Sequence, residues 1–291
     1  MGLVLLGQFL MTLPDGKLHI TICDVGQGDG AYLRFPDGRD IVIDGGPGSQ
    51  ILTCLGKVMP FWDRTIDAVM LTHPDLDHFK GLIPVLQRYR VGTYIHSDIA
   101  NTTPLYQELE SIVKTKHIPV RFVASHEKMK LGDVTLGVLW PAQTYLSLTN
   151  NVLGTQSDTA VSRESHRNDY AIVFHLRYGI FDAVFTADAD ENVEPYYTGE
   201  FLSPDGIELL KVPHHGSRTG MTDAFLSWLH PKYAVISVGA KNTYGHPSPQ
   251  AIEQLTHEGA TIFRTDQRGS ITFVTDGKTV SIRTEKKQQL H

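Results

Sequence analysis

Hydrophobic and polar positions follow two different periods along this chain. Short alternating or continuously apolar segments rich in β-branched residues predict strands, as at 18–23 and 66–71. Apolar residues three or four positions apart predict helices, as at 105–116. Further strands are predicted at 31–35, 40–43, 93–96, 120–123, 129–131, 135–139, 170–177, 183–186, 208–212, 233–238, 261–264, 270–274 and 279–283, and further helices at 51–59, 81–90, 222–229, 248–257 and near Glu191.

Strands dominate the first part of this pattern, and strands and helices alternate later, which predicts a layered α/β fold. The segment 146–167 is polar and follows neither period, so we expect a long loop there and a candidate lid. No repeat, low-complexity segment or linker divides the chain. A length of 291 residues allows two domains of about 150 residues each. One α/β domain is the simpler prediction.

Composition excludes several classes of protein. Hydrophobic residues at 41% and charged residues at 20% are ordinary for a globular chain and argue against disorder, collagen and coiled coil. The two cysteines, Cys23 and Cys54, make no disulfide framework, and they are too few for a four-cysteine zinc ribbon. No apolar run reaches the length of a membrane span. The apolar residues 1–11 lack the basic start and cleavage site of a signal peptide.

Histidine is the unusual entry in the composition, with 14 residues in a chain of net charge −6. The strongest cluster is Thr72–His78, which reads Thr-His-Pro-Asp-Leu-Asp-His and lies directly after the predicted strand 66–71. Imidazole and carboxylate groups together suit zinc or manganese. Since Asp77 and His78 are adjacent, their side chains diverge and could serve two metals. The structural alternative is a solvated loop that caps a helix through Asp77.

Four other segments place similar chemistry at predicted strand ends, where loops can converge on one site. Asp188 could bridge two metals, although such a residue alone is more often a helix cap. The glycine-rich loop 24–29 allows close approach of the backbone, and Asp29 could orient a metal ligand. By itself that loop is a weak signal, because tight β-turns look similar. The remaining two segments are 211–217, with His214 and His215, and 244–249, with His246.

In combination these motifs resemble the metallo-β-lactamase superfamily, and in particular the hydrolase domain of the ComEC family of competence proteins. The resemblance covers about residues 18–284. Besides Thr72–His78, it rests on the segments 24–29, 43–47, 186–188, 213–217, 244–248 and 264–266. It implies an α/β fold in the form of a four-layer αββα sandwich, with a metal site at one edge between the two sheets.

The resemblance also implies roles for individual residues. Asp75 stands where the broader superfamily often has histidine, and Ala187 replaces the usual glycine before Asp188. The middle-motif ligand is less clear, because His166 and the neighbouring Asn168 both suit that position. The implied metal ligands are His73, Asp75, Asp77, His78, Asp188 and His246, with His166 as a further candidate. The implied catalytic residues are Asp77, His214 and His215, the substrate contacts are Gly216, Ser217, Asn168 and Tyr244, and the residues that support the ligands are Asp29 and Asp44.

The paired histidines leave one alternative open, since either His214 or His215 could bind metal while the other acts as an acid or contacts phosphate. The predicted function is a metal-dependent hydrolase with one or two zinc or manganese ions, namely a phosphodiesterase or nuclease that acts on DNA in competence. A carboxyl-centred metallohydrolase, such as a lactonase, β-lactamase or thioesterase, is the alternative among enzymes. A non-catalytic binding module stabilised by metal is the alternative from another class.

The resemblance finally suggests an organisation and partners for the chain. Residues 1–17 would be an N-terminal extension or the remnant of a membrane helix, 18–284 the hydrolase domain, and 285–291 a polar tail. DNA, including single-stranded DNA, is the expected partner, and a membrane channel is a further candidate. A fragment of a competence protein would lie outside the cytoplasm, and a free-standing relative would lie inside it. The sequence does not define the oligomeric state.

Overall fold

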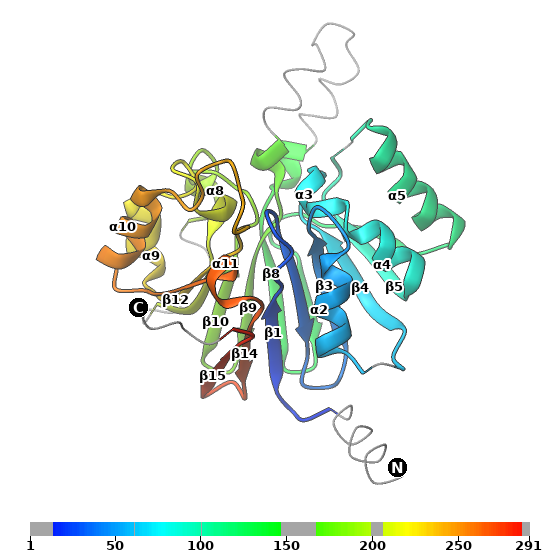
Figure 1. Cartoon of the computed structure of the whole chain (residues 1–291), viewed down its shortest axis with the longest axis horizontal. Coiled ribbons are helices and arrows are strands. Elements are labelled where there is room, and N and C mark those ends of the chain that lie inside the picture. The colour runs from blue at the N-terminus through cyan, green and yellow to red at the C-terminus, as the bar shows by residue number, and fades with distance from the viewer. Residues whose placement is uncertain (1–13, 61, 100, 147–166, 199–205, 287–291) are drawn as a thin grey trace, which may run out of the picture.

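Two mixed sheets face each other, and helices cover the outer surface of each sheet (Figure 1). The prediction of a four-layer αββα sandwich is therefore confirmed. The computed structural model describes residues 14–60, 62–99, 101–146, 167–198 and 206–286. His166 and nearly all of the expected lid at 146–167 lie outside these residues.

The first sheet combines the N-terminal strands with two strands from the C-terminal part of the chain. Its order is β15 (Val280–Thr284), β14 (Ile271–Thr275), β1 (Leu18–Ile22), β2 (Gly30–Arg34), β3 (Asp40–Gly45), β4 (Thr65–Leu71), β5 (Arg90–His96) and β6 (Val120–Phe122). The strands from β3 to β6 are parallel, and the others pair antiparallel. The helices α2 (Gln50–Val58), α4 (Leu82–Arg88) and α5 (Pro104–Thr115) cover its outer face.

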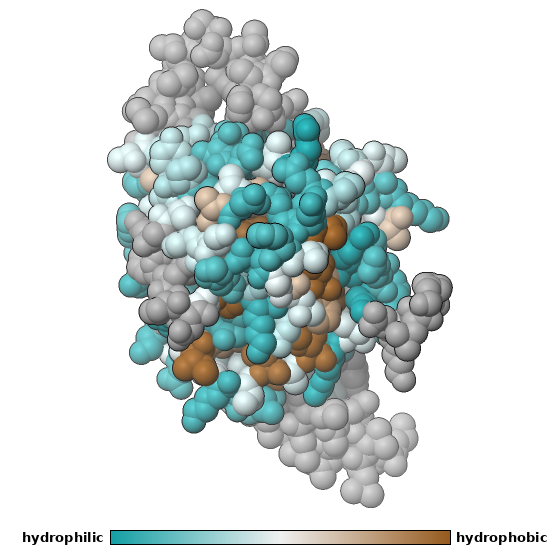
Figure 2. All heavy atoms as spheres, turned by 90° about the vertical axis from the view of Figure 1, so that its left-hand side faces the viewer, coloured by the Kyte–Doolittle hydropathy of each residue, from teal (hydrophilic) through white to brown (hydrophobic). Residues whose placement is uncertain are grey.

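The second sheet is formed by the later part of the chain. Its order is β13 (Thr261–Arg264), β12 (Pro231–Ile236), β11 (Ile207–Lys211), β10 (Phe181–Phe185), β9 (Val173–Tyr178), β8 (Val134–Trp140) and β7 (Lys128–Leu131). The short helix α8 (Glu194–Tyr197) and the helices α9 (Asp223–Leu229) and α10 (Pro249–His257) lie on its outer side, and the short helix α11 (Thr265–Arg268) follows β13. Figure 2 views the molecule from the left-hand side of Figure 1, and this face is mostly hydrophilic, with small hydrophobic patches.

Three separate apolar clusters explain why the molecule has four layers. One cluster fills the space between the sheets, and there the rings of Phe174 and Phe185 stack at 4.7 Å between centroids. A second cluster joins the first sheet to α2, α4 and α5, and a third joins the second sheet to its helices. Each strand at the centre of a sheet is thus buried on both faces, which accounts for the continuous apolar runs in the sequence.

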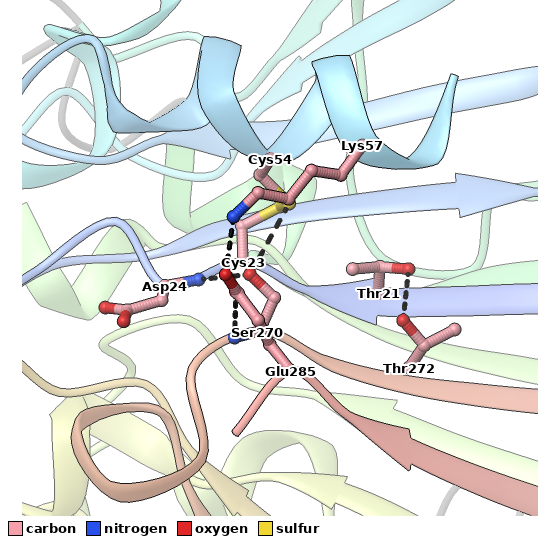
Figure 3. Close-up of a disulfide and its surroundings, with 8 residues drawn as sticks. All are labelled: Thr21, Cys23, Asp24, Cys54, Lys57, Ser270, Thr272 and Glu285. Carbon is pink, nitrogen blue, oxygen red and sulfur yellow. Dashed lines mark hydrogen bonds and ion pairs between the residues drawn. A yellow bond between two sulfur atoms is a disulfide. The ribbon is translucent and has the colours of Figure 1, made fainter. Parts of the chain in front are cut away.

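A disulfide joins Cys23, just after β1, to Cys54 in α2 (Figure 3). The backbone N–H of Asp24 donates to Ser270 Oγ at 3.2 Å, and the same hydroxyl lies 3.9 Å from Cys54 Sγ. The ion pair of Lys57 with Glu285 lies beside it. One cross-link therefore ties the start of the 24–29 loop to the helix layer, without the multiple bridges of a disulfide framework.

Two short helical turns depart from the predicted elements. The expected strand 170–177 begins later, at Val173, because the 3-10 turn η1 (Arg167–Tyr170) precedes it. A second such turn, η2 (Pro213–Gly216), follows β11. None of the helices in the described part of the chain is both long and apolar enough to cross a membrane.

Candidate metal centre

The Thr72–His78 loop begins where β4 ends and runs into the short helix α3 (Leu76–Phe79). The side chains of His73 and His78 are buried, with 4.0 Å between their ring centroids. Asp75, not Asp77, occupies the N-cap position of α3, and its side chain makes no capping hydrogen bond. Helix capping through Asp77 is therefore wrong as an account of this loop.

Four side chains from the two halves of the molecule converge beside this loop. One donor atom each of Asp77, His78, Asp188 and His215 lies within 4.8 Å of the others. Asp188 Oδ2 is 3.3 Å from Nε2 of His78 and 3.3 Å from Nε2 of His215, and the latter nitrogen is 3.4 Å from Asp77 Oδ2. Asp77 and His78 follow β4 of the first sheet, whereas Asp188 follows β10 and His215 follows β11 of the second.

The polar atoms of this group fit a divalent cation. Nε2 of His78 and Nε2 of His215 are buried without a hydrogen-bond partner. Burial lowers the pKa of both imidazoles, but the carboxylates around them outweigh it, so that the pKa of each lies well above its usual value. A bound cation would take over the role of these protons, because it compensates the same carboxylates. Buried imidazole and carboxylate donors form the set that zinc and manganese prefer.

A second set of donors lies next to the first. His73 Nε2 and the other carboxylate oxygen of Asp188, Oδ1, are both buried without a hydrogen-bond partner. Burial lowers the pKa of His73 to about 4, which keeps the imidazole neutral and able to bind a cation. Asp75 Oδ2 lies 3.8 Å from His73 Nε2, while its other oxygen lies 2.7 Å from Nε of Arg167 in an ion pair. Oδ2 of Asp188 therefore contacts the first set of donors, and its Oδ1 is free for a further ligand.

Buried contacts at Nδ1 fix the imidazole rings of His78 and His215. Asp44 Oδ2 lies 2.8 Å from Nδ1 of His78, and Asp44 also accepts from the backbone and the hydroxyl of Thr72. His215 Nδ1 donates to the carbonyl oxygen of Ser237 at 2.9 Å. These contacts turn Nε2 of each ring towards the centre, as in many metal sites. Asp29 Oδ1 lies 3.4 Å from the Nδ1 of His215.

The glycine-rich loop 24–29 packs directly on Asp77. Asp29 N–H donates to the Asp77 carbonyl oxygen at 3.2 Å. Gly28 has a φ of +132°, and a Cβ there would lie 2.2 Å from the same oxygen. The second oxygen of Asp29 forms a buried ion pair with Lys211 at 2.6 Å. Glycine is therefore required where this loop meets the Thr72–His78 loop.

The paired histidines have different surroundings. His214 and His215 have φ values of 45° and 54°, so their backbone lies in the left-handed region. His215 points into the buried centre. His214 Nδ1 instead lies 2.8 Å from Asp190 Oδ1, and its Nε2 lies 3.8 Å from Asp188 Oδ2. Only His215 of the pair belongs to the four-donor group.

His246, predicted as a ligand, lies at the margin of the centre. Its ring centroid is 5.7 Å from that of His214 and 6.4 Å from that of His215, and its Nδ1 is buried without a hydrogen-bond partner. It is not part of the four-donor group, and its role as a ligand stays a prediction. The exposed Tyr244 stacks on it at 5.8 Å.

The predicted substrate contacts flank the same region. Gly216 and Ser217 follow the histidine pair, and a Cβ on Gly216 would lie 2.7 Å from Pro247 Cβ. Asn168 lies in η1, next to Arg167, which pairs with Asp75. Their contacts with a substrate stay predictions.

Sequence reasoning did not identify Asp190, Arg167 or Lys211 as part of this region. Asp190 belongs to the Asp-Ala-Asp segment that Asp188 begins, so a signal was present in the sequence. Lys211 likewise begins the segment 211–217, but only the fold places it beside Asp29. Arg167 carried no such signal, because only the fold places it beside Asp75.

Comparisons with known proteins agree with this geometry. The family model for the metallo-beta-lactamase superfamily matches residues 23–240. ComE operon protein 3 of Bacillus subtilis (strain 168) is 26% identical over 91% of this chain and 34% of its own length. Competence protein ComA of Neisseria gonorrhoeae is 23% identical over 90% of this chain and 33% of its own length. The chain thus spans about a third of these curated relatives.

Solved structures show the same fold. The metallo-beta-lactamase fold protein YhfI from Bacillus subtilis has a TM-score of 0.53 and 12% identity, over 91% of this chain and 100% of that one. Igni18, a metallo hydrolase from Ignicoccus hospitalis, has a TM-score of 0.54 and 15% identity, over 88% of this chain and 98% of that one. At these identities the likeness concerns the fold alone.

Proposed function

This chain belongs to the metallo-β-lactamase superfamily, and from that premise we propose that it is a metal-dependent phosphodiesterase that cleaves DNA in competence. The observation that carries the metal-dependent part is the convergence of Asp77, His78, Asp188 and His215, with unpartnered imidazole nitrogens buried between carboxylates. The choice of DNA is supported by the curated relative from Neisseria gonorrhoeae, which is named a competence protein.

One divalent ion would be held by Asp77, His78, Asp188 and His215. A second would be held by His73, Asp75 and the other oxygen of Asp188, which supports Asp188 as the bridging residue. Zinc and manganese are both compatible with these donors. When bound, such ions lower the pKa of a coordinated water and neutralise charge on phosphate oxygens.

The residues of the chain divide the remaining tasks. His214 would protonate the leaving oxygen. This role is supported by the contact of its Nδ1 with Asp190 and by its Nε2, which lies 3.8 Å from Asp188 Oδ2. Gly216, Ser217, Asn168 and Tyr244 are the candidate contacts for the substrate phosphate. Arg167 fixes one oxygen of Asp75, so that the other oxygen remains on the side of His73.

A substrate panel tests the proposal. The protein is incubated with bis-p-nitrophenyl phosphate, single-stranded and duplex DNA, and nitrocefin, each with Mn²⁺, Zn²⁺ or EDTA. We expect phosphodiester cleavage that disappears in EDTA and in Asp77→Ala. The matched control is Asp133→Ala, which removes an exposed carboxylate in the turn between β7 and β8 and should leave cleavage unchanged.

Other outcomes would identify the alternative functions. Cleavage of nitrocefin without cleavage of any phosphodiester would overturn the proposal and indicate a carboxyl-centred hydrolase. Metal binding without turnover of any substrate would indicate a binding module.

A further inference from the structure

An open hollow of about 400 Å³ lies between the ends of α4 and α5 and the beginnings of β4 and β5. Four cationic side chains line it, and apolar parts of three further residues complete the wall. The lining residues are Arg64, Arg88, Arg90 and Lys116, with Tyr89, Val91 and Ile118. No acidic residue is among them, although the chain as a whole has a net charge of −6.

The four cations keep their charge uncompensated. Lysine and arginine side chains form several ion pairs within the part of the chain that the structure describes. None of these ion pairs includes one of the four cations of the hollow. Arg90 donates to Thr65 Oγ1 at 3.3 Å, and Lys116 Nζ donates to two carbonyl oxygens at the end of α4. The Arg64 guanidinium lies 5.9 Å from the ring centroid of Tyr89. These contacts orient the groups without neutralising them.

Neighbouring carboxylates are engaged elsewhere. Asp63 Oδ1 accepts from the backbone N–H of Thr65 at 2.9 Å. Asp67 Oδ2 accepts from the backbone N–H of Asp40 at 2.9 Å. Both acids therefore serve the backbone of the sheet. A hollow with several guanidinium groups and no carboxylate in its wall suits a phosphate, which guanidinium can bind through two parallel hydrogen bonds.

The position of the hollow relates it to the metal centre. β4 begins beside the hollow, at Thr65, and ends at Leu71, where the ligand loop starts. Seven strand residues cover roughly 20 Å. Since phosphates of one DNA strand are about 3.4 Å apart along the helix axis, roughly six nucleotides separate the two places. A short oligonucleotide could bind either the hollow or the metal centre, and a longer strand could bind both at once.

We infer that this basic hollow is a second nucleic-acid site, which binds backbone phosphates of a strand whose scissile phosphate lies at the metal centre. The inference deepens the proposed function, on which the choice of a DNA strand rests. A concave wall with guanidinium groups favours individual backbone phosphates over the flat surface of a membrane. Binding should depend on strand length and on salt, and it should be independent of base sequence.

Binding of fluorescent oligothymidylates of 4 and 24 nucleotides, measured by anisotropy in EDTA to prevent cleavage, tests this inference. The variant Arg88→Glu/Arg90→Glu is compared with Lys278→Glu/Arg283→Glu, which makes the same change in net charge at exposed positions near β15. We expect the first variant to bind the 24-mer at least tenfold more weakly, and to reduce the salt slope by about 1.4 for two lost phosphate contacts. The first variant should also weaken any binding of the 4-mer to the hollow, and the control should change binding of either oligonucleotide less than twofold.

Hydrolysis of bis-p-nitrophenyl phosphate separates this inference from the proposed function. Both variants should retain wild-type hydrolysis, because the hollow does not touch the metal centre. Equal 24-mer affinity in the two variants would overturn the inference even if hydrolysis is intact. Selective loss of 24-mer binding in a protein that hydrolyses no phosphodiester would support the hollow and refute the nuclease. If the protein bound vesicles of anionic phospholipid through these arginines but not the 24-mer, the hollow would be a lipid site.

Discussion

At the scale of single residues, the two adjacent histidines show how backbone conformation divides chemical roles. His214 and His215 both adopt left-handed conformations, and their rings contact different partners. His215 reaches the four-donor group, and His214 reaches Asp190. Sequence motifs alone cannot separate two identical neighbours, since the separation depends on φ and ψ.

The first prediction follows from this division. His215→Gln should weaken metal binding and abolish phosphodiester cleavage, because it removes a ligand. His214→Gln should retain the full metal content while cleavage falls by roughly 10²–10⁴-fold, because it removes a proton donor. Metal content by elemental analysis and cleavage of bis-p-nitrophenyl phosphate measure the two effects. Loss of metal in His214→Gln would show that the assignments are reversed.

At the scale of elements, the cross-link between the end of β1 and α2 constrains the chain where it approaches the metal centre. Cys23 and Cys54 are 31 positions apart, and closing a loop of this length in the unfolded chain corresponds to roughly 3–4 kcal/mol of stability in the chain-entropy description. We expect Cys23→Ser/Cys54→Ser to unfold at a lower urea concentration, with a loss of about that size.

A reducing agent provides the internal control for this prediction. It should shift the urea midpoint of the wild type towards that of the double variant and leave the variant itself unchanged. An equal midpoint for the reduced and oxidised wild type would refute the stabilising role of the bridge.

Glu194 connects two elements of the outer layer of the second sheet. Its carboxylate accepts hydrogen bonds from the backbone N–H and the hydroxyl of Thr222, the N-cap of α9. Burial raises the pKa of Glu194 to about 7, although the bonds from Thr222 oppose the shift. The folded chain therefore retains a proton that the unfolded chain has already released at lower pH.

The sign of the pH dependence follows. Between about pH 4.5 and 7 the native state binds more protons at this position than the unfolded state, so stability decreases as the pH rises through that window. Glu194→Gln, which keeps an acceptor oxygen for Thr222, should remove up to about 3 kcal/mol of this decrease. Urea unfolding at pH 5 and pH 8 measures it. The same difference between the two pH values in the variant and the wild type would contradict the prediction.

Helices and strands with a clear hydrophobic period were predictable from the sequence. Contacts between residues far apart in the sequence were not. The sequence predicted β4 and α5 nearly at their observed bounds, because burial on one or both faces leaves an apolar pattern. It indicated the donor-rich loop Thr72–His78 as a candidate, since several potential ligands stood at one strand end. It could not indicate the contact of Asp75 with Arg167 or the bridge of Cys23 with Cys54, because neither depends on a local pattern.

At the scale of the whole molecule, the candidate metal centre lies at the junction of the two halves. Asp77 and His78 come from the first sheet, and Asp188 and His215 come from the second. A cation bound to all four would link the halves in the native state only. Stability should then rise with metal concentration.

Thermal unfolding with and without metal measures this link. At a free Mn²⁺ or Zn²⁺ concentration of about 100 times the dissociation constant, we expect about 3 kcal/mol of added stability. For a chain of this size, that corresponds to a rise in Tm of roughly 5–10 °C. Asp77→Ala should show a much smaller rise, and Asp133→Ala should show the full one. An unchanged Tm in the wild type would exclude a cation that links the two halves.

The pairing of β1 with β14 has a consequence for synthesis on the ribosome. On one side, residues 18–22 pair with residues 271–275, which lie about 250 positions later in the chain. At about 5–20 residues per second, roughly 10–50 s pass between the emergence of the two strands. During that time one edge of β1 lacks its native neighbour and is open to pairing with other chains. We therefore expect nascent chains that end before β14 to aggregate more readily than full-length chains, and to depend more strongly on chaperones.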